Sequence, residues 1–184
     1  MEIISIFAPD NYLFAVQYEG QEEDEYTRLL YTEWQDLEKI LAFMQENSMI
    51  LENNSTWEKI KLPFLATQQV LKEANDLIEI FQKLNENTKH NIQPNFDDHF
   101  KFLDGPYKNM VELIPMKSYG NGRPSLLRIY AIKLDTNTYV ITGGGIKLCD
   151  TIQNSPGIKE HVLQNINLVR NFLRTNGITS SEDI

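Results

Sequence analysis

The chain has 184 residues, a net charge of -9 and one cysteine, and these properties exclude several classes of protein. Its length suits one domain with a full core, so we expect a single domain over residues 1–184. No stretch approaches the roughly 20 apolar residues of a membrane span, and the first residues lack the pattern of a signal peptide. A lone cysteine cannot form an intramolecular disulfide, which favours a cytoplasmic location.

Charge is distributed unevenly along the chain. Residues 1–105 contain 8 Lys and Arg against 20 Asp and Glu, a net charge of -12, whereas residues 106–184 contain 9 against 6, a net charge of +3. An acidic first half argues against nucleic-acid binding by the whole surface, but the second half could present a local basic patch. The alternative is that both halves are ordinary solvated faces of one acidic protein.

The first half is predicted to begin with a β-hairpin and to continue mostly as helices. Residues 2–7 and 12–18 form the two strands, because Pro and Asx residues between them favour a turn. A helix follows a capping box that begins at Thr32. The Asn- and Ser-rich residues 47–56 are then expected to form a loop.

Two longer helices are predicted to cover the sheet. After Pro63, apolar residues recur with the helical period as far as Leu84, and the pattern breaks from Asn85. Phe81 is expected to be a core residue of this helix. A second helix, residues 156–175, begins with Pro at its first position and carries Phe172 in its apolar stripe.

The centre of the predicted sheet is a hairpin over residues 126–142. Apolar and polar residues alternate on both sides of a polar turn, so Leu127 and Ile129 lie on one face, and Arg128 and Tyr130 on the other. Two further segments are assigned next to it: a strand at Met110–Ile114 that ends at Pro115, and a basic loop at Lys117–Pro124. Together with the helices of residues 64–86 and 156–175, these elements predict an α+β fold with a small, mainly antiparallel sheet.

Motifs of standard enzyme classes are not found. The glycines before Lys147 lack the spacing of a phosphate-binding loop, and no Ser or Cys has the context of a nucleophile. A metal cluster can be considered at His90, Asp97, Asp98 and His99. Their spacing matches no helical ligand pattern, however, so a solvated loop is the favoured interpretation. We therefore predict no metal site and no cofactor.

A group of cations and aromatic residues forms the strongest candidate site. They come from the hairpin and its adjoining loops: Tyr119, Arg123, Arg128, Tyr130, Lys133 and Lys147. Cations and aromatic rings on one small sheet suit an RNA backbone and an unstacked base. Lys133 has the parity of Ile129, which points to the face that a helix covers. We therefore expect it at the strand end, where its ammonium can reach water, and so at the periphery of the site. The alternative is that Tyr130 belongs to the core and that Arg128 is a structural ion-pair partner.

The hairpin also resembles a known family. The run Leu127–Ile132, the return strand Tyr139–Ile141 and the segment Gly144–Lys147 resemble the RelE/HigB-like toxins of bacterial toxin–antitoxin pairs. The resemblance covers residues 109–175 closely, and the earlier part only in the order of its elements. It implies a RelE-like fold, an antitoxin protein as partner, and action on RNA or the ribosome, because many members are ribosome-dependent mRNA endonucleases.

Two functions follow from these observations. In the first, the protein is a toxin that acts on RNA. Arg128 and Lys147 match basic residues of the family and stabilise charge on the scissile phosphate. The RNA strand is bound by Tyr119, Arg123 and Tyr130. No side chain is evident as a general base. In the second, the protein is a catalytically silent RelE-like module whose acidic N-terminal half contacts a protein partner.

Overall fold

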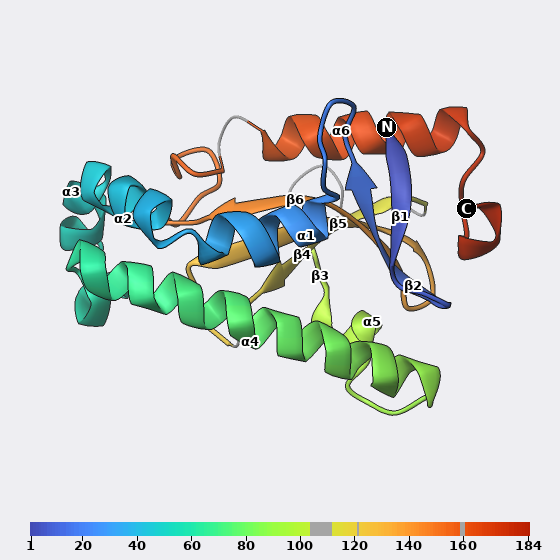
Figure 1. Ribbon diagram of the computed structural model, residues 1–184, viewed down its shortest axis with the longest axis horizontal. Helices are drawn as coiled ribbons and strands as arrows, with labels where there is room; N and C mark the ends of the chain where they lie inside the picture. The colour runs from blue at the N-terminus through green and yellow to red at the C-terminus, as the bar shows by residue number, and fades with distance from the viewer. Residues whose placement is uncertain (104–111, 121, 159–160) are drawn as a thin grey trace.

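The computed structural model describes residues 1–103, 112–120, 122–158 and 161–184 (Figure 1). The strands are β1 (Glu2–Phe7), β2 (Asp10–Gln17), β3 (Lys101–Phe102), β4 (Ile114–Tyr119), β5 (Leu127–Asp135) and β6 (Thr138–Ile146). The α-helices are α1 (Glu25–Thr27), α2 (Leu37–Glu46), α3 (Ser48–Asn53), α4 (Pro63–Lys89), α5 (Phe96–His99) and α6 (Val162–Thr175). One π-helical and three 3-10 segments complete them: η1 (Arg28–Thr32, π), η2 (Glu33–Gln35), η3 (Ser55–Ile60) and η4 (Ser181–Asp183).

The strands form one sheet in the order β1-β2-β6-β5-β4-β3. Strands β2 and β6 are parallel, and every other neighbouring pair of these six strands is antiparallel. The sheet is therefore mixed and mostly antiparallel, and the predicted α+β fold is confirmed at this level. The predicted hairpin is β5 and β6, and it occupies the centre of the sheet.

The two halves of the chain share this sheet. Residues Leu13–Ala15 of β2 pair with Tyr139–Ile141 of β6. Beyond Ile141, β6 continues to Ile146 with β5 as its only strand neighbour among the described residues. The acidic first half thus supplies β1 and β2 at one edge of the sheet, β3 at the other, and most of the described helices.

Helices cover both faces of the sheet, as the alternation along β5 predicts. Figure 1 shows α4 and α6 on opposite sides of the strands. Leu127 and Ile129 belong to the large core cluster that contains Phe81 of α4. Ile132, on the other face, packs in a cluster with Val169 of α6. Side chains of opposite parity therefore build two separate apolar layers.

Several predicted boundaries are corrected by the structure. The loop expected at residues 47–56 is helix α3 followed by the start of η3. Asp36, not Thr32, caps α2, because its carboxylate accepts a hydrogen bond from the main-chain N–H of Lys39 at 3.1 Å. Helix α4 runs to Lys89, beyond the expected break at Asn85, which is itself buried.

Corrections also apply to the second half. Helix α6 begins at Val162 and not at 156, because the chain around Ser155 turns so that the Ser155 hydroxyl accepts a hydrogen bond from the N–H of Leu148 at 2.8 Å. Strand β4 starts at Ile114, contains Pro115 and includes the first three residues of the expected loop at 117–124. The remainder of the strand expected at 110–114 lies partly outside the described residues.

None of the described helices is both long enough and apolar enough to cross a membrane.

Candidate functional site

Three of the predicted site residues lie on one face of the sheet. Register pairs Tyr119 of β4 with Arg128 of β5, and Arg128 with Gly145 of β6. Lys147 follows Gly145 by two residues, so it has the same parity. Gly145 has no side chain, and the main chain of Gly157 packs closely on it: a Cβ atom there would lie 2.5 Å from the Gly157 carbonyl oxygen.

Arg123 and Arg128 both stack on Tyr119. The guanidinium carbon of Arg123 lies 3.9 Å from the ring centroid and that of Arg128 lies 4.2 Å from it. Lys117 is also near, with its ammonium nitrogen 6.0 Å from the same centroid. Attraction to the ring offsets part of the repulsion between these like charges. Tyr119 therefore gathers two guanidinium groups, and its ring is already stacked by protein side chains and not open for a base.

Arg128 is held by main-chain carbonyl groups. Its Nη1 donates to the carbonyl oxygens of Ser125, at 2.8 Å, and Leu127, at 2.6 Å. The residue is only 8% exposed, and burial lowers the pKa of its guanidinium. Within the described part of the chain no carboxylate forms an ion pair with it. The charge is consequently fixed in place by carbonyl groups and has no direct anionic partner among the described residues.

A buried carboxylate on α4 organises the loop that holds Arg128. Glu73 is 3% exposed and accepts hydrogen bonds from the N–H groups of Leu126 at 3.2 Å and Leu127 at 3.0 Å. It also accepts one from the Ser125 hydroxyl at 2.8 Å. A Cβ atom added at Gly120 would lie 2.8 Å from that hydroxyl oxygen, so the approach of this chain segment requires glycine.

Sequence reasoning missed Glu73. The signal was available, because Glu73 lies three residues after Val70 and four before Leu77, on the apolar stripe of α4. A charged residue on a buried stripe indicates a specific partner. Here the partners are main-chain donors at the start of β5.

Lys147 follows directly after the last residue of β6, Ile146. It is half-buried, and its ammonium donates to the main-chain carbonyl of Asp150 at 2.6 Å. Burial first, and then the nearby positive charge of Arg128, lower the pKa of Lys147. This influence places the ammonium and the guanidinium within electrostatic range of each other. Arg123, Arg128 and Lys147, with Tyr119, are called the cationic cluster below.

Two other candidates are placed elsewhere. Tyr130 is 1% exposed and packs in a cluster with Ile158 and Val162, so its ring is not available to stack an incoming base. Lys133 lies on the opposite face, where it forms an ion pair with Asp97 at 2.7 Å. Lys133 is thus peripheral to the cluster, as predicted. Tyr130 fits the alternative in which it is a core residue.

His99 is not part of the solvated loop that the sequence favoured. It ends α5, is half-buried and lies edge-on to Phe81 and Phe100, with ring centroids 5.5 and 5.6 Å apart. Its Nε2 is 2.6 Å from the Ser118 hydroxyl. The described residues contain no group of three acidic, His or Cys side chains suited to a metal, so the metal cluster is not formed among them.

The burial of His99 predicts a pH dependence of stability. Burial, and then Lys101, lower its pKa from 6.5 to about 4. Between these values the unfolded chain binds the proton and the folded chain does not, so stability is lost as pH falls from about 6.5 to 4. Between about pH 7 and 4.5, we expect the free energy of unfolding to fall by about 2 kcal/mol more in the parent than in His99→Gln. Urea unfolding at both pH values measures this difference. Equal losses in both proteins would show that the imidazole is not held neutral.

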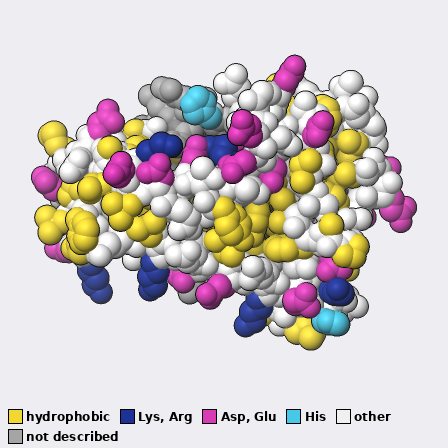
Figure 2. Space-filling model, in the orientation of Figure 1, with side chains coloured by type: hydrophobic (Ala, Val, Ile, Leu, Met, Phe, Trp, Pro, Cys, Tyr) yellow, Lys and Arg dark blue, Asp and Glu magenta, His cyan; other side chains and the backbone are white. Residues whose placement is uncertain are grey.

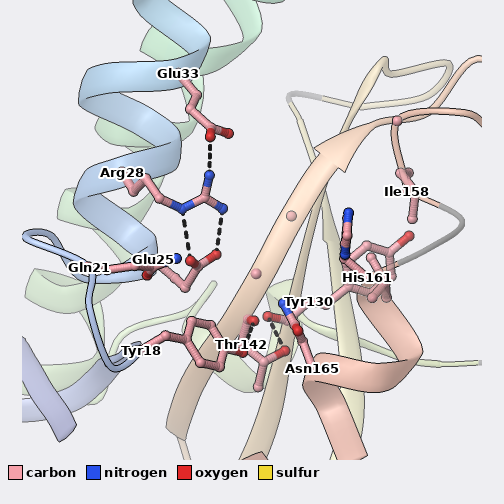
Figure 3. Close-up of a pocket in the computed structure, with 14 residues that line it drawn as sticks. Tyr18, Gln21, Glu25, Arg28, Glu33, Tyr130, Thr142, Ile158, His161 and Asn165 are labelled. Carbon is pink, nitrogen blue, oxygen red and sulfur yellow. Dashed lines mark hydrogen bonds and ion pairs between the residues drawn. The ribbon is translucent and has the colours of Figure 1, made fainter. Parts of the chain in front are cut away.

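A cavity of about 460 Å³ lies where α1 and η1 face the part of β6 beyond its pairing with β2 (Figure 3). Arg28 lies between Glu25 and Glu33, and both Glu25 oxygens accept its hydrogen bonds, at 2.8 and 2.7 Å. Tyr18 donates to the carbonyl of Thr142 at 2.8 Å. Tyr18, Glu25 and Arg28 thus have partners, whereas the buried Oε1 of Gln21, in the same lining, has none among the described residues.

The chain was compared with known proteins. No family model, no curated protein and no solved structure matches it.

Proposed function

We propose that the protein binds RNA through the cationic cluster and acts as the toxin component of a RelE/HigB-like toxin–antitoxin pair. The observation that carries this proposal is the stack of Arg123, Tyr119 and Arg128 with Lys147 beside it. A RelE-like arrangement of the fold belongs to the same proposal. It is supported by the parallel pairing of an N-terminal strand, β2, with the last strand of the hairpin.

The cluster suits a phosphodiester group. Guanidinium groups present planar sets of N–H donors that match phosphate oxygens, and an ammonium adds a point charge. Arg128 is positioned before any ligand arrives, because Ser125 and Leu127 fix one of its nitrogens. Such preorganised charge stabilises the extra negative charge that develops on phosphorus during cleavage. In this proposal Arg123 binds the strand, and Arg128 with Lys147 acts on the scissile phosphate.

Expression of the protein tests this proposal. We expect the parent to arrest bacterial growth with loss of intact mRNA, and the double variant Arg123→Gln, Lys147→Gln to lower the rate of RNA cleavage by a factor of about 10² or more. Arg123 is exposed and Lys147 half-buried, so the double variant should fold. Arg174→Gln removes an exposed cation from the last turn of α6, a helix that contributes no residue to the cluster, and is the matched control. Normal growth with intact RNA on expression of the parent would contradict the toxin function.

The antitoxin would be a protein that neutralises this effect. A toxin whose cluster is exposed must be covered when inactive, and an acidic segment would complement Arg123 and Lys147. Growth arrest that is relieved by the adjacent gene product, and not by unrelated proteins, would support this partner.

A specific observation also favours the second function, a catalytically silent protein-binding module. Large apolar side chains are exposed on the acidic half, among them Met49 at 73%, Leu62 at 64% and Phe64 at 56%. Figure 2 shows such side chains grouped where α2, α3 and the start of α4 meet, with Asp and Glu nearby. Binding through the acidic residues should weaken between roughly 0.1 and 1 M salt. Equal capture of a partner at both salt concentrations would contradict binding through the acidic residues.

A further inference from the structure

The cavity of about 460 Å³ beside β6 is lined by none of the residues of the cationic cluster. Segments far apart in the sequence line it, among them residues of the segment 18–33, the second half of β6 and the start of α6. Figure 3 shows Gln21, Glu25 and Arg28 on one side of β6, and His161 and Asn165 on the other. The volume is within the range of small-ligand sites, so the cavity is a candidate site separate from RNA binding.

Gly143 of β6 brings two polar side chains to the same part of the cavity. Its φ angle is 148°, a backbone conformation that residues with a side chain rarely adopt. A Cβ atom there would lie 3.3 Å from Oε2 of Glu25 and 3.5 Å from Nδ2 of Asn165. A longer side chain at this position would occupy the space between these groups. Glycine therefore lets the carboxylate of α1 and the amide of α6 face a common space.

The described lining of this cavity has an excess of negative charge. Glu25 is 1% exposed, and its two oxygens accept hydrogen bonds from Arg28 at 2.8 and 2.7 Å. Arg28 also forms an ion pair with Glu33. With histidine counted as neutral, the described lining residues thus contain two carboxylates and one cation. An anionic ligand would be repelled by this excess, and a cationic ligand would be attracted.

The lining also contains oxygen atoms that can accept a hydrogen bond from a ligand. Oε1 of Gln21 is buried and has no partner among the described residues. The main chain of Gln21 is fixed, because its N–H donates to the Tyr18 carbonyl at 3.1 Å and its carbonyl accepts from Nε2 of Gln17 at 3.0 Å. The Tyr18 hydroxyl donates its proton to the Thr142 carbonyl, so its oxygen retains only acceptor capacity. A buried acceptor without a partner destabilises the folded state, and a ligand that donates to it would remove this cost.

We infer that this cavity binds a small organic cation that carries ammonium groups. An ammonium group has N–H donors and no acceptor, and it carries a positive charge. It therefore matches both the acceptor oxygens of Gln21 and Tyr18 and the excess charge that Glu25 contributes. Asn165 bounds the site on the side of α6. Because no residue of the cationic cluster takes part, this inference goes beyond the proposed function and does not depend on it.

Three compounds with the same four-carbon skeleton test the charge of the ligand. Putrescine carries an ammonium group at each end, 1,4-butanediol is its neutral analogue, and succinate is an anionic one. In titration calorimetry of the full chain, we expect putrescine to bind with a Kd of about 1 mM or less, and the other two at least about tenfold more weakly. Absence of putrescine binding, or equal binding of succinate or the diol, would overturn the inference.

Gln21→Ala and Asn165→Ala locate the site. Gln21→Ala removes a buried acceptor without a partner, so we expect it to weaken putrescine binding at least about tenfold and not to lower the Tm of the free protein. Asn165→Ala should also weaken binding, whereas Asn167→Ala, an exposed residue of α6 outside the lining, is the matched control. The double variant Arg123→Gln, Lys147→Gln should bind putrescine like the parent, which separates this site from the RNA site. Unchanged putrescine affinity in Gln21→Ala would overturn the inference and leave the proposed function standing.

Discussion

Replacing Glu73 with Ala should lower the free energy of unfolding by about 3 to 5 kcal/mol and should weaken RNA binding with it. The carboxylate is buried and accepts from the N–H groups of Leu126 and Leu127 and from the Ser125 hydroxyl. Hydrogen bonds to a charged group contribute roughly 1.5 to 3 kcal/mol each, and buried donors left unpaired are costly. The loss extends to the site, because Ser125 and Leu127 hold Arg128.

Gln69→Ala is the control for this prediction. Gln69 donates to the same carboxylate at 2.9 Å but is itself half-buried and has access to solvent. Its removal should change the free energy of unfolding by less than about 1 kcal/mol. Urea unfolding of the parent and both variants gives the comparison. Similar losses for the two variants would show that Glu73 does not organise the start of β5.

Phe81→Ala should produce the other large effect, a loss of about 3 to 5 kcal/mol in the free energy of unfolding. Phe81 is 0% exposed, and its ring lies 6.0 Å from that of Tyr26 and 6.1 Å from that of Phe100. Truncation would leave a cavity between α4, α5 and α1 that these rings cannot fill. The imidazole of His99 also borders the ring, with centroids 5.5 Å apart.

Phe172→Ala is the matched comparison in the other layer. Phe172 is only half-buried beside the cluster that contains Val169, so its loss should be smaller, about 1 to 2 kcal/mol. Thermal or urea unfolding of both variants measures the difference. A Phe172→Ala loss equal to that of Phe81→Ala would mean that the α6 layer contributes as much core as the α4 layer.

Alternation and helical period were sufficient to predict the main elements of the fold. The parity of Leu127 and Arg128 assigned their faces, and the stripe through Phe81 located α4, because local patterns determine these features. Boundaries were less predictable. Helix α3 forms in a polar segment because Leu51 is buried in the core, and such a tertiary contact leaves little trace in composition.

The candidate site could be predicted only in part. Charge and parity brought Arg123, Arg128 and Lys147 into consideration, and the structure stacks the two arginines on the ring of Tyr119. His99 and Glu73 come from distant parts of the chain, and their contacts cross the fold. Sequence spacing cannot reveal that Nε2 of His99 lies 2.6 Å from the hydroxyl of Ser118, 19 residues away. Tyr130 was misjudged because an aromatic residue in a strand has the same pattern whether it packs or binds.

The salt dependence of RNA binding tests the central claim most directly. Each cation that neutralises a phosphate of single-stranded RNA contributes about -0.7 to the slope of log affinity against log salt concentration. With Arg123, Arg128 and Lys147 engaged, we expect a slope of about -2 for the parent and Arg174→Gln, and about -0.7 for the double variant Arg123→Gln, Lys147→Gln. An unchanged slope in the double variant would contradict the assignment of this cluster as the RNA site.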